Sequence, residues 1–452
     1  MNHNAQSVAG ISAAQGYTPL MYRLLLLLLL TLPACQRPPM VLPTMFAAGR
    51  VDPLADVPEA ERTQTLTFFY ATDRRYDEDT TDWRQFGRHR SGDINVGQVT
   101  VRLAPKGDWS AISTAARGGE GAKRYSPRMT VLNRMGRLDM PGGLPVSSAD
   151  VDHEGDQNNT VTSRFIKSLD AALDRSPGKA ITIFIHGFKT DFKDAALSAS
   201  EYDLYTGGLG PFILYSWPSY DSLWEYSHDR DSARFTTGHA RQFVALLADE
   251  IRANRLSAEK INFVAHSSGA EVVGSVLREL ALMFDELSPE ERRDRWRIGS
   301  VLLIAPDIST DVARERVLKE DLRGMYDEIV VYSSRRDRAL EWASRMLYRT
   351  PRIGSIRETD LTEDDRYWLG QAGNVALIDI DSQPNEDFVH HSHHRFSAAV
   401  ASDIILCLRS DLTPEGRGLE RDEGKLIWRF ADDYTDRVTE AAVRVYGERP
   451  TP

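Results

Sequence analysis

The chain has 452 residues, of which 41% are hydrophobic, so it can bury the core of one large domain or two smaller ones. Its formal net charge is −11 at pH 7 and it has no long basic run, which argues against nucleic acid as a partner. Its two cysteines, Cys35 and Cys407, exclude a disulfide framework.

The predicted elements begin with an export signal. Arg23 precedes the apolar run Leu24–Leu30, and the sequence LPAC ends at Cys35. Extended to Leu32, this stretch is about nine residues long. That is far fewer than the roughly twenty residues that a membrane-spanning helix needs, but it suits the short leucine core of a signal peptide. The cysteine after Leu-Pro-Ala resembles a bacterial lipobox. Residues 1–35 are therefore predicted to be upstream residues and a lipoprotein-like signal peptide, with Cys35 lipidated. Plain secretion and an uncleaved anchor are the alternatives.

A linker, two strands and an insertion are predicted next. Residues 36–60 are rich in proline and alanine with little periodicity, which is typical of a linker. The β-rich run Thr65–Thr72 and the alternating run Asn95–Leu103 predict two strands. Residues 104–159 are polar and contain several glycines, so we expect a surface insertion there.

From residue 161 onward, helices alternate with short apolar strands. The predicted strands are Ala180–Ile185, Pro211–Ser216, Lys260–Ala265, Gly299–Ala305, Asp327–Tyr332 and Asn374–Asp379. The predicted helices are Val161–Leu173, Lys193–Tyr205, His239–Arg255, Glu271–Phe284, Asp311–Leu322 and Phe396–Leu408. This alternation indicates an α/β domain over residues 61–410, with a mainly parallel sheet covered by helices on both faces. Residues 411–452 are predicted to be a C-terminal helical extension, with a helix over Trp428–Tyr446.

A serine lies at the junction of one predicted strand and the following helix. The sequence between them reads AHSSG, with the first serine at Ser267. This is close to the G-x-S-x-G nucleophile elbow, in which a sharp turn exposes the serine hydroxyl above the sheet, although alanine replaces the first glycine. A serine nucleophile also needs a base, a group that orients the base, and donors for the oxyanion.

Candidate oxyanion donors follow a neighbouring strand, which runs into the HGF sequence at 186–188. Beside a nucleophile elbow, such a loop supplies one backbone N–H, and the residue after the nucleophile supplies the other. The predicted donors are therefore the amides of Phe188 and Ser268. The alternative is that His186 only caps the strand.

Two aspartates are candidates for the group that orients the base. Asp337 follows the strand Asp327–Tyr332, where this acid usually lies, and Asp307 follows the preceding strand. We favour Asp337, with Asp307 as the alternative acid. The aspartate that does not orient the base is expected to cap a helix N-terminus.

The base is expected on the loop between the last strand and the helix after it. Residues 390–394 read HHSHH and hold four of the chain's eleven histidines, so one of them is the predicted base. Adjacent histidines on one loop rarely converge on a single ion, and no partner lies at a recognisable metal-ligand spacing. We therefore predict no metal and no cofactor.

These residues also carry a resemblance to a known family. The order serine, acid, histidine is that of α/β-hydrolases. The chain resembles a bacterial α/β-hydrolase-fold family of unknown function whose members are described as esterase- or lipase-like. The resemblance covers roughly residues 65–408 and rests on FYATDR at 69–74, IHGF at 185–188, YSWPS at 215–219, Tyr226 with Asp229, AHSSG at 265–269, APDI at 305–308, residues 332–340, and His391-Ser392 with Asp403.

The resemblance implies which histidine is the base. The family's terminal motif is of the Gly-His-Ser type and aligns with residues 390–392, which selects His391, although His390 stands in place of the glycine. His394 is the alternative base. The elbow of family members commonly reads HSMG, whereas this chain has HSSG, which leaves the nucleophile in place. The implied triad is Ser267, Asp337 and His391 on an α/β-hydrolase fold.

We therefore expect a serine hydrolase that cleaves carboxylic esters through an acyl-enzyme intermediate. Its predicted partners are a small-molecule or lipid ester and, through the lipid anchor, a membrane. The predicted location is the bacterial cell envelope, with the protein facing the periplasm or the exterior. Two alternatives remain open: the same triad acting on amides or thioesters, and a non-catalytic envelope lipoprotein that uses the hydrolase scaffold for binding.

Overall fold

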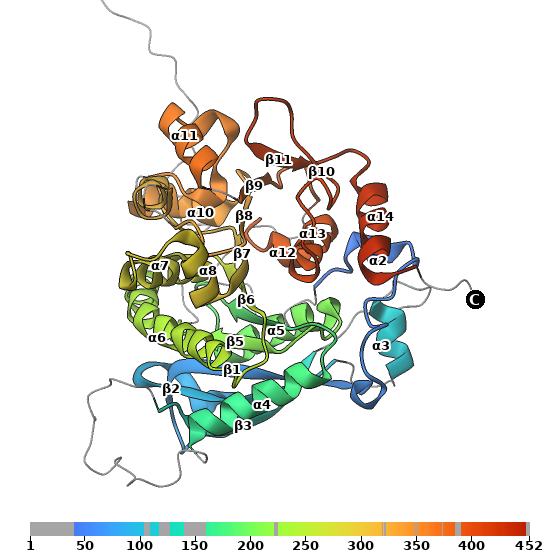
Figure 1. Ribbon diagram of the computed structural model, residues 1–452, viewed down its shortest axis with the longest axis vertical. Helices are drawn as coiled ribbons and strands as arrows, with labels where there is room; N and C mark the ends of the chain where they lie inside the picture. The colour runs from blue at the N-terminus through green and yellow to red at the C-terminus, as the bar shows by residue number, and fades with distance from the viewer. Residues whose placement is uncertain are drawn as a thin grey trace, which may run out of the picture. The chain divides into compact units, whose positions relative to one another are not determined.

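An eleven-stranded sheet forms the centre of the computed structural model (Figure 1). The strands are β1 (Thr65–Tyr76), β2 (Phe86–Arg102), β3 (Arg128–Arg137), β4 (Ala180–Ile185), β5 (Phe212–Ser216), β6 (Lys260–His266), β7 (Ile298–Ile304), β8 (Glu328–Ser333), β9 (Val375–Asp379), β10 (Leu419–Glu420) and β11 (Ile427–Phe430). Their order across the sheet is β10-β11-β9-β8-β7-β6-β4-β5-β1-β2-β3. The structure describes residues 40–103, 109–116, 127–139, 160–220, 225–318, 320, 322–348, 350–372, 374–384 and 390–448.

The middle of the sheet is parallel. Each neighbouring pair from β11 through β9, β8, β7, β6, β4 and β5 to β1 is parallel. Antiparallel strands complete the two edges, with β2 and β3 on one side and β10 on the other. Every residue of β4 and β7 is buried, because helices cover both faces of the sheet. The predicted mainly parallel sheet with helices on both faces is therefore confirmed.

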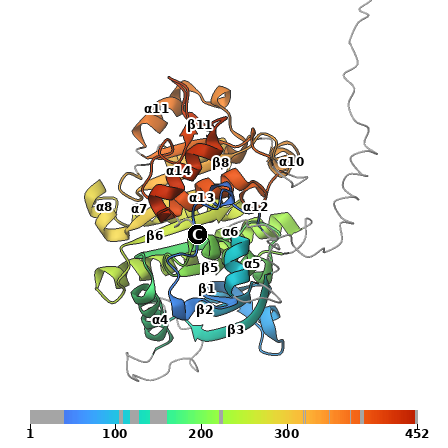
Figure 2. The ribbon, with the colours of Figure 1, turned by 90° about the vertical axis from the view of Figure 1, so that its right-hand side faces the viewer.

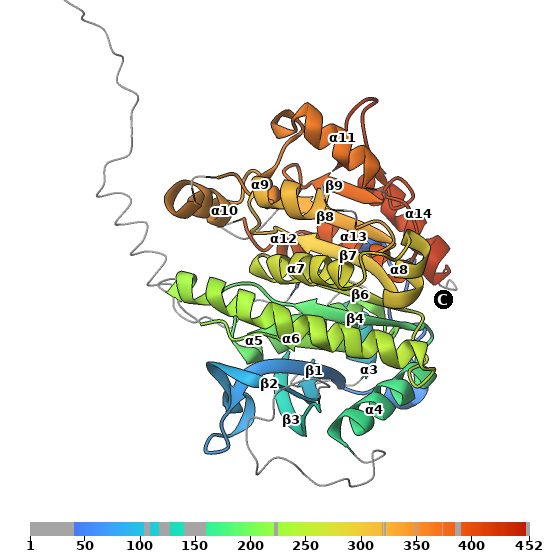
Figure 3. The ribbon, with the colours of Figure 1, turned by 60° about the vertical axis from the view of Figure 1, so that its left-hand side comes forward.

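The two faces of the sheet carry different helices. The helices are α2 (Thr44–Ala47), α3 (Trp109–Ala116), α4 (Val161–Arg175), α5 (Phe192–Thr206), α6 (Tyr226–Arg252), α7 (Ser268–Met283), α8 (Pro289–Trp296), α9 (Thr310–Ala313), α10 (Arg338–Trp342), α11 (Glu363–Gln371), α12 (His393–Phe396), α13 (Ala398–Arg409) and α14 (Tyr434–Tyr446). On one side, α5, α13 and α14 share a core with Val264 of β6 (Figure 2). On the other side, α4, α6 and α7 share a core with Phe263 (Figure 3). Within the described ranges, no helix is both long and apolar enough to cross a bilayer.

Residues 40–60 pack against the domain, which corrects the linker predicted for residues 36–60. Met45, Phe46 and Leu54 are buried in the core that includes α13 and α14. The Met40 amide also donates a hydrogen bond to Glu201 Oε1 at 2.7 Å. The buried residues are irregularly spaced, so the sequence shows neither a helical nor a strand period there. Residues 1–39, including Cys35, lie outside the described part of the chain.

The range 104–159, predicted as a surface insertion, contributes to the sheet. Strand β3 pairs with β2 in an antiparallel register from Arg128 to Arg137. Helix α3 buries Ile112 and Ala116 in the core. The sequence of β3, RMTVLNRMGR, mixes charged and apolar residues because the strand lies at the sheet edge and is only partly buried. Residues 104–108, 117–126 and 140–159 lie outside the described part of the chain.

The C-terminal segment is also part of the sheet, which corrects the helical extension predicted for residues 411–452. Strand β11 lies parallel to β9 and occupies the start of the predicted helix Trp428–Tyr446. Helix α14 begins only at Tyr434. The short apolar run LIW at 426–428 continues the apolar spacing of the helix, so sequence periodicity does not separate the strand from the helix.

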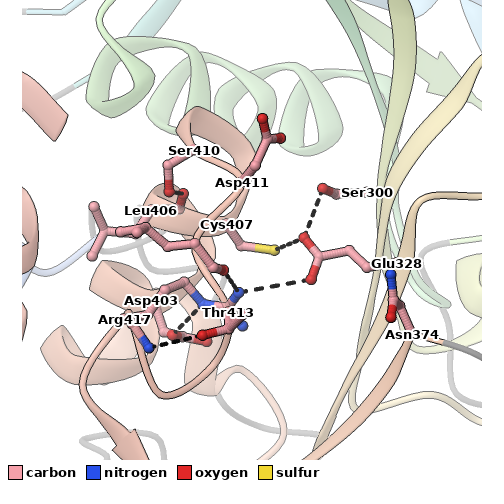
Figure 4. A network of polar contacts seen from close by, with 12 residues as sticks. Ser300, Glu328, Asn374, Asp403, Leu406, Cys407, Ser410, Asp411, Thr413 and Arg417 are labelled. Atoms are coloured by element: carbon pink, nitrogen blue, oxygen red, sulfur yellow. Dashed lines mark hydrogen bonds and ion pairs between the residues drawn. The ribbon is translucent and has the colours of Figure 1, made fainter.

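A buried polar network attaches this C-terminal segment to the domain (Figure 4). Arg417 is fully buried and donates from Nε to Asp403 Oδ1 of α13 at 2.8 Å. Tyr332 of β8 donates to the other oxygen of Asp403 at 2.7 Å. Cys407 is a buried free thiol that donates to Glu328 Oε1 at 3.1 Å. Buried charges require such partners, so the network fixes the C-terminal segment to α13 and β8.

Candidate active site

The predicted site residues lie on loops at one edge of the sheet. Strands β4, β6, β7 and β8 are parallel neighbours, and the segments after them contain Phe188, Ser267, Asp307 and Asp337 respectively. The segment after β9 leads to His391. Because parallel strands end at the same edge, the topology gathers these five residues on one side of the domain.

Ser267 lies on a strained turn between β6 and α7. Its backbone has φ of 53° and ψ of −120°, a conformation that residues other than glycine rarely adopt and that is typical of a nucleophile elbow. Hydrogen bonds hold the turn: the Ser267 amide donates to Ile304 O at 2.9 Å, and its carbonyl accepts from the Ala270 amide at 3.0 Å. Gly269 is required, because an added Cβ would lie 2.6 Å from the carbonyl oxygen of Ile185.

The loop after β4 packs directly against the serine. An added Cβ at Gly187 would lie 2.9 Å from Ser267 Cβ, so only glycine permits this close approach. The amide nitrogens of Phe188 and Ser268 donate no hydrogen bond to any residue in the described part of the chain. Two amides without acceptors beside a serine are the arrangement expected of an oxyanion hole.

His391 and Asp337 are in direct contact. His391 Nδ1 donates to Asp337 Oδ2 at 2.7 Å, and Asp337 is fully buried. The other oxygen of Asp337 accepts from the Leu340 amide at 2.9 Å and so caps α10. These bonds fix the carboxylate, which in turn fixes the imidazole with its proton on Nδ1 and leaves Nε2 able to accept a proton.

His266 connects the histidine loop to the serine turn. This residue directly precedes Ser267, and its Nε2 donates to the His391 carbonyl at 3.2 Å. The ring centroids of His266 and His391 are 4.9 Å apart. The serine turn, His391 and Asp337 therefore lie in one connected set of contacts.

Asp307, the alternative acid, has other partners. Tyr226 donates to its Oδ2 at 2.5 Å, and Arg352 Nε lies 3.0 Å from its Oδ1. Burial raises the pKa of the Asp307 carboxyl, whereas the charge of Arg352 and the hydrogen bond from Tyr226 oppose that rise. His391 is near enough for its charge to act on Asp307, but the hydrogen bond of the imidazole goes to Asp337.

His394, the alternative base, is buried in an aromatic stack. Its ring stacks on Tyr202 at a centroid distance of 6.2 Å and contacts the ring of His266 in a tilted arrangement at 4.4 Å. Its neighbour His393 is also buried, and burial lowers the pKa of that imidazole to about 4. Of the four histidines in the 390–394 loop, His391 is therefore the one held by Asp337.

Arg74, at the end of β1, supports the loop that carries Phe188. Its buried guanidinium donates to the carbonyls of Thr190 at 2.8 Å and Gly87 at 3.0 Å, and to Ser216 Oγ at 2.9 Å. Burial lowers the pKa of Arg74 to about 10. In the sequence, Arg74 stands out only as part of the FYATDR motif of the family resemblance, with no role predicted for it. A charged residue at the end of an apolar strand is the one signal that could have revealed its role.

Asp229, in the first turn of α6, holds the same loop from the other side. Its carboxylate accepts from Ser219 Oγ at 2.6 Å and the Tyr220 amide at 2.8 Å, and also from the Lys189 amide. Trp217 donates from its indole to the His186 carbonyl at 2.7 Å and stacks on that imidazole. These residues therefore brace the site loops.

Comparison with known proteins gave one family match. A family model described as "Alpha/beta hydrolase of unknown function (DUF900)" matches residues 162–409. No curated protein matches the chain.

Solved structures gave distant matches. Thermogutta terrifontis esterase 2 phosphonylated by cyclosarin is 12% identical with a TM-score of 0.29, and the match covers 52% of this chain and 81% of that one. Acylaminoacyl peptidase from Pyrococcus horikoshii is 10% identical with a TM-score of 0.30, and the match covers 71% of this chain and 54% of that one.

Proposed function

The chain belongs to the alpha/beta hydrolases of unknown function (DUF900), and from this membership we propose that it is a serine hydrolase that cleaves carboxylic esters. Membership of this family implies the α/β-hydrolase fold. The proposal that a serine cleaves esters is supported most directly by the 2.7 Å contact between His391 Nδ1 and Asp337 Oδ2, beside the turn that contains Ser267. The two amides without acceptors, at Phe188 and Ser268, support it independently.

The proposed reaction has two halves. Ser267 Oγ attacks the ester carbonyl carbon while His391 Nε2 takes the hydroxyl proton, and Asp337 stabilises the imidazolium that forms. The amides of Phe188 and Ser268 hold the oxyanion. The C–O bond to the alcohol then breaks, the alcohol leaves with the proton from His391, and the acyl group remains on Ser267. Water, deprotonated by His391, then attacks the acyl carbon. The bond from that carbon to Ser267 Oγ breaks, His391 returns the proton to the serine, and the acid leaves.

A serine substitution tests this proposal. We expect Ser267→Ala to lower kcat/KM on p-nitrophenyl acetate at least about 10³-fold and to abolish labelling by a fluorophosphonate probe. Ser275→Ala is the matched control, because Ser275 is half-buried on the same helix, α7. Unchanged turnover and labelling in Ser267→Ala would contradict the proposal.

The wild-type results separate the alternatives. Fluorophosphonate labelling without ester turnover would favour an amide or thioester substrate. A protein inert to the probe and to a panel of esters would favour a non-catalytic envelope lipoprotein.

We also propose that Cys35 carries a lipid that holds the protein in the bacterial cell envelope, facing the periplasm or the exterior. The support comes from the sequence alone, because Cys35 lies outside the described residues. Radiolabelled palmitate should be incorporated into the wild-type protein in cells and not into Cys35→Ala. Equal incorporation into both proteins would contradict lipidation at this position.

A further inference from the structure

An apolar cavity of about 130 Å³ lies on the α7 side of the sheet. Its walls are formed by α7, by β7, β8 and β9, and by the segments before β8 and β9. Leu303, Val331 and Leu377 line it from the sheet, Leu277 from α7 and Leu369 from α11. Because aliphatic side chains dominate the lining, the cavity suits a hydrocarbon group rather than a polar ligand.

Backbone hydrogen bonds link the lining of the cavity to the serine turn. Ile308 lines it, and the amide of the preceding residue, Asp307, donates to the Ser267 carbonyl at 3.3 Å. Ile353 lines the same wall and donates from its amide to the Ile308 carbonyl at 2.9 Å. Gly274, also in the lining, lies seven residues after Ser267, which is about 10 Å along a helix.

Gly274 keeps space open in the cavity wall. Glycine lowers the stability of a helix interior relative to alanine, so a glycine there usually reflects a close contact. No close contact requires it here, because an added Cβ would meet only Ile308 Cδ1, at 3.9 Å. Gly269 of the same helix shows the opposite case, since a Cβ there would meet backbone oxygens at 2.6 Å. The effect of glycine at 274 is therefore to leave volume in the cavity.

Two of the three charged residues in the lining, Arg314 and Asp365, pair with each other, and the third, Asp360, faces Arg357 outside the lining. Arg314 donates from Nε to Asp365 Oδ1 at 2.6 Å and from Nη2 to Asp365 Oδ2 at 2.9 Å. This pair joins the π-helical turn Arg314–Leu318 to α11, so it ties together two segments that cover the cavity. A bidentate pair of this kind leaves little capacity to bind a ligand head group.

We propose that this cavity binds the hydrocarbon chain of the acyl group of the ester substrate. This inference rests on the proposed ester hydrolysis and adds a substrate class, namely esters of medium-chain acids. An engineered apolar cavity of about 150 Å³ in another protein takes up benzene, so about 130 Å³ accommodates about six carbon atoms. Helix α7 connects the two places, because it begins directly after Ser267 and carries Gly274 in the cavity wall.

Chain-length selectivity tests the cavity. On p-nitrophenyl esters from acetate to decanoate, wild-type kcat/KM should rise by up to about fourfold per methylene and level off near hexanoate or octanoate. Gly274→Leu should fill the cavity and lower the ratio of kcat/KM on hexanoate to kcat/KM on acetate at least about tenfold. The matched control is Gly238→Leu, because Gly238 lies on α6 with nothing within 4 Å of an added Cβ. It should keep the wild-type profile.

Two further measurements make the outcome decisive. Leu369→Trp takes up cavity volume from α11 and replaces Gly274→Leu if that variant does not unfold cooperatively. A folded filling variant with the wild-type chain-length profile would overturn the inference while leaving ester hydrolysis intact. Benzene should raise the Tm of the inactive Ser267→Ala protein and not of the variant that also carries Gly274→Leu. A wild-type protein inactive on every ester would instead overturn the proposed function, with the benzene result still reporting on the cavity.

Discussion

Replacing Asp337 with asparagine should separate catalysis from folding. Asparagine is isosteric, so its oxygen can still accept the Leu340 amide and cap α10. Its NH₂ group would face His391 Nδ1, which must then accept a hydrogen bond instead of donating one. The imidazole proton moves to Nε2, the nitrogen that has to take the proton of Ser267. The base is therefore blocked although the geometry is kept.

The expected loss in kcat is about 10⁴-fold, the loss seen when the aspartate of another serine triad is replaced by asparagine. The free energy of unfolding should fall by only about 1–3 kcal/mol, because one charge-assisted hydrogen bond becomes a neutral one. Steady-state hydrolysis of p-nitrophenyl acetate measures the first quantity, and urea denaturation measures the second.

Asp307→Asn is the control, because it should lower stability more than Asp337→Asn does and lower activity less. It leaves the His391–Asp337 bond intact but deprives the buried Arg352 of its carboxylate, so it should cost about 3–5 kcal/mol of stability. Its kcat should fall much less than that of Asp337→Asn. The reasoning is refuted if Asp337→Asn keeps its activity within about tenfold, or if folded Asp307→Asn loses as much activity as Asp337→Asn.

Three other predictions follow from buried charged and titratable groups. Arg417→Ala should lower the free energy of unfolding by about 3–5 kcal/mol in urea denaturation, because Asp403 loses its cation, and a loss below about 1 kcal/mol would contradict this. Arg74→Met should lower kcat/KM by about 10²-fold with cooperative unfolding retained, because the Phe188 loop loses its anchor, and an unchanged kcat/KM would contradict this. Burial lowers the pKa of His393 to about 4, so between pH 4 and about 6.5 the unfolded state binds the extra proton and stability rises with pH. This contributes about 3 kcal/mol, and His393→Phe should flatten the pH dependence of urea stability in that window.

The sequence predicts the centre of the fold because its strands are continuous apolar runs. The sequence predicts strand β6, the serine turn and α7 together, because an apolar run ends in small residues and a helical period follows. The segments at the edges of the domain cannot be predicted from apolar periodicity in this way. Residues 40–60 contain buried Met45 and Phe46 without a period, and β11 merges with the apolar pattern that leads into α14.

The residues that brace the site are harder to predict, because burial of a charge leaves no mark on the sequence. Arg74, Asp229 and Arg352 stand among other charged residues, and only the folded chain shows that each is enclosed. Their partners are mostly backbone carbonyls and amides of distant loops. Such contacts depend on how the loops meet and not on residue type, so the motifs that include Arg74 and Asp229 do not show what these residues contact.

The choice between Asp307 and Asp337 illustrates what the fold adds. Both aspartates follow parallel strands within a few residues, and both are buried, so the sequence leaves both open. The difference lies in their partners. Arg352, from the segment between β8 and β9, lies against Asp307 and offsets its charge, which weakens any stabilisation that Asp307 could give to an imidazolium. In the described part of the chain, no lysine or arginine forms an ion pair with Asp337. Its full charge is therefore directed at His391, as a group that must stabilise a transient cation requires.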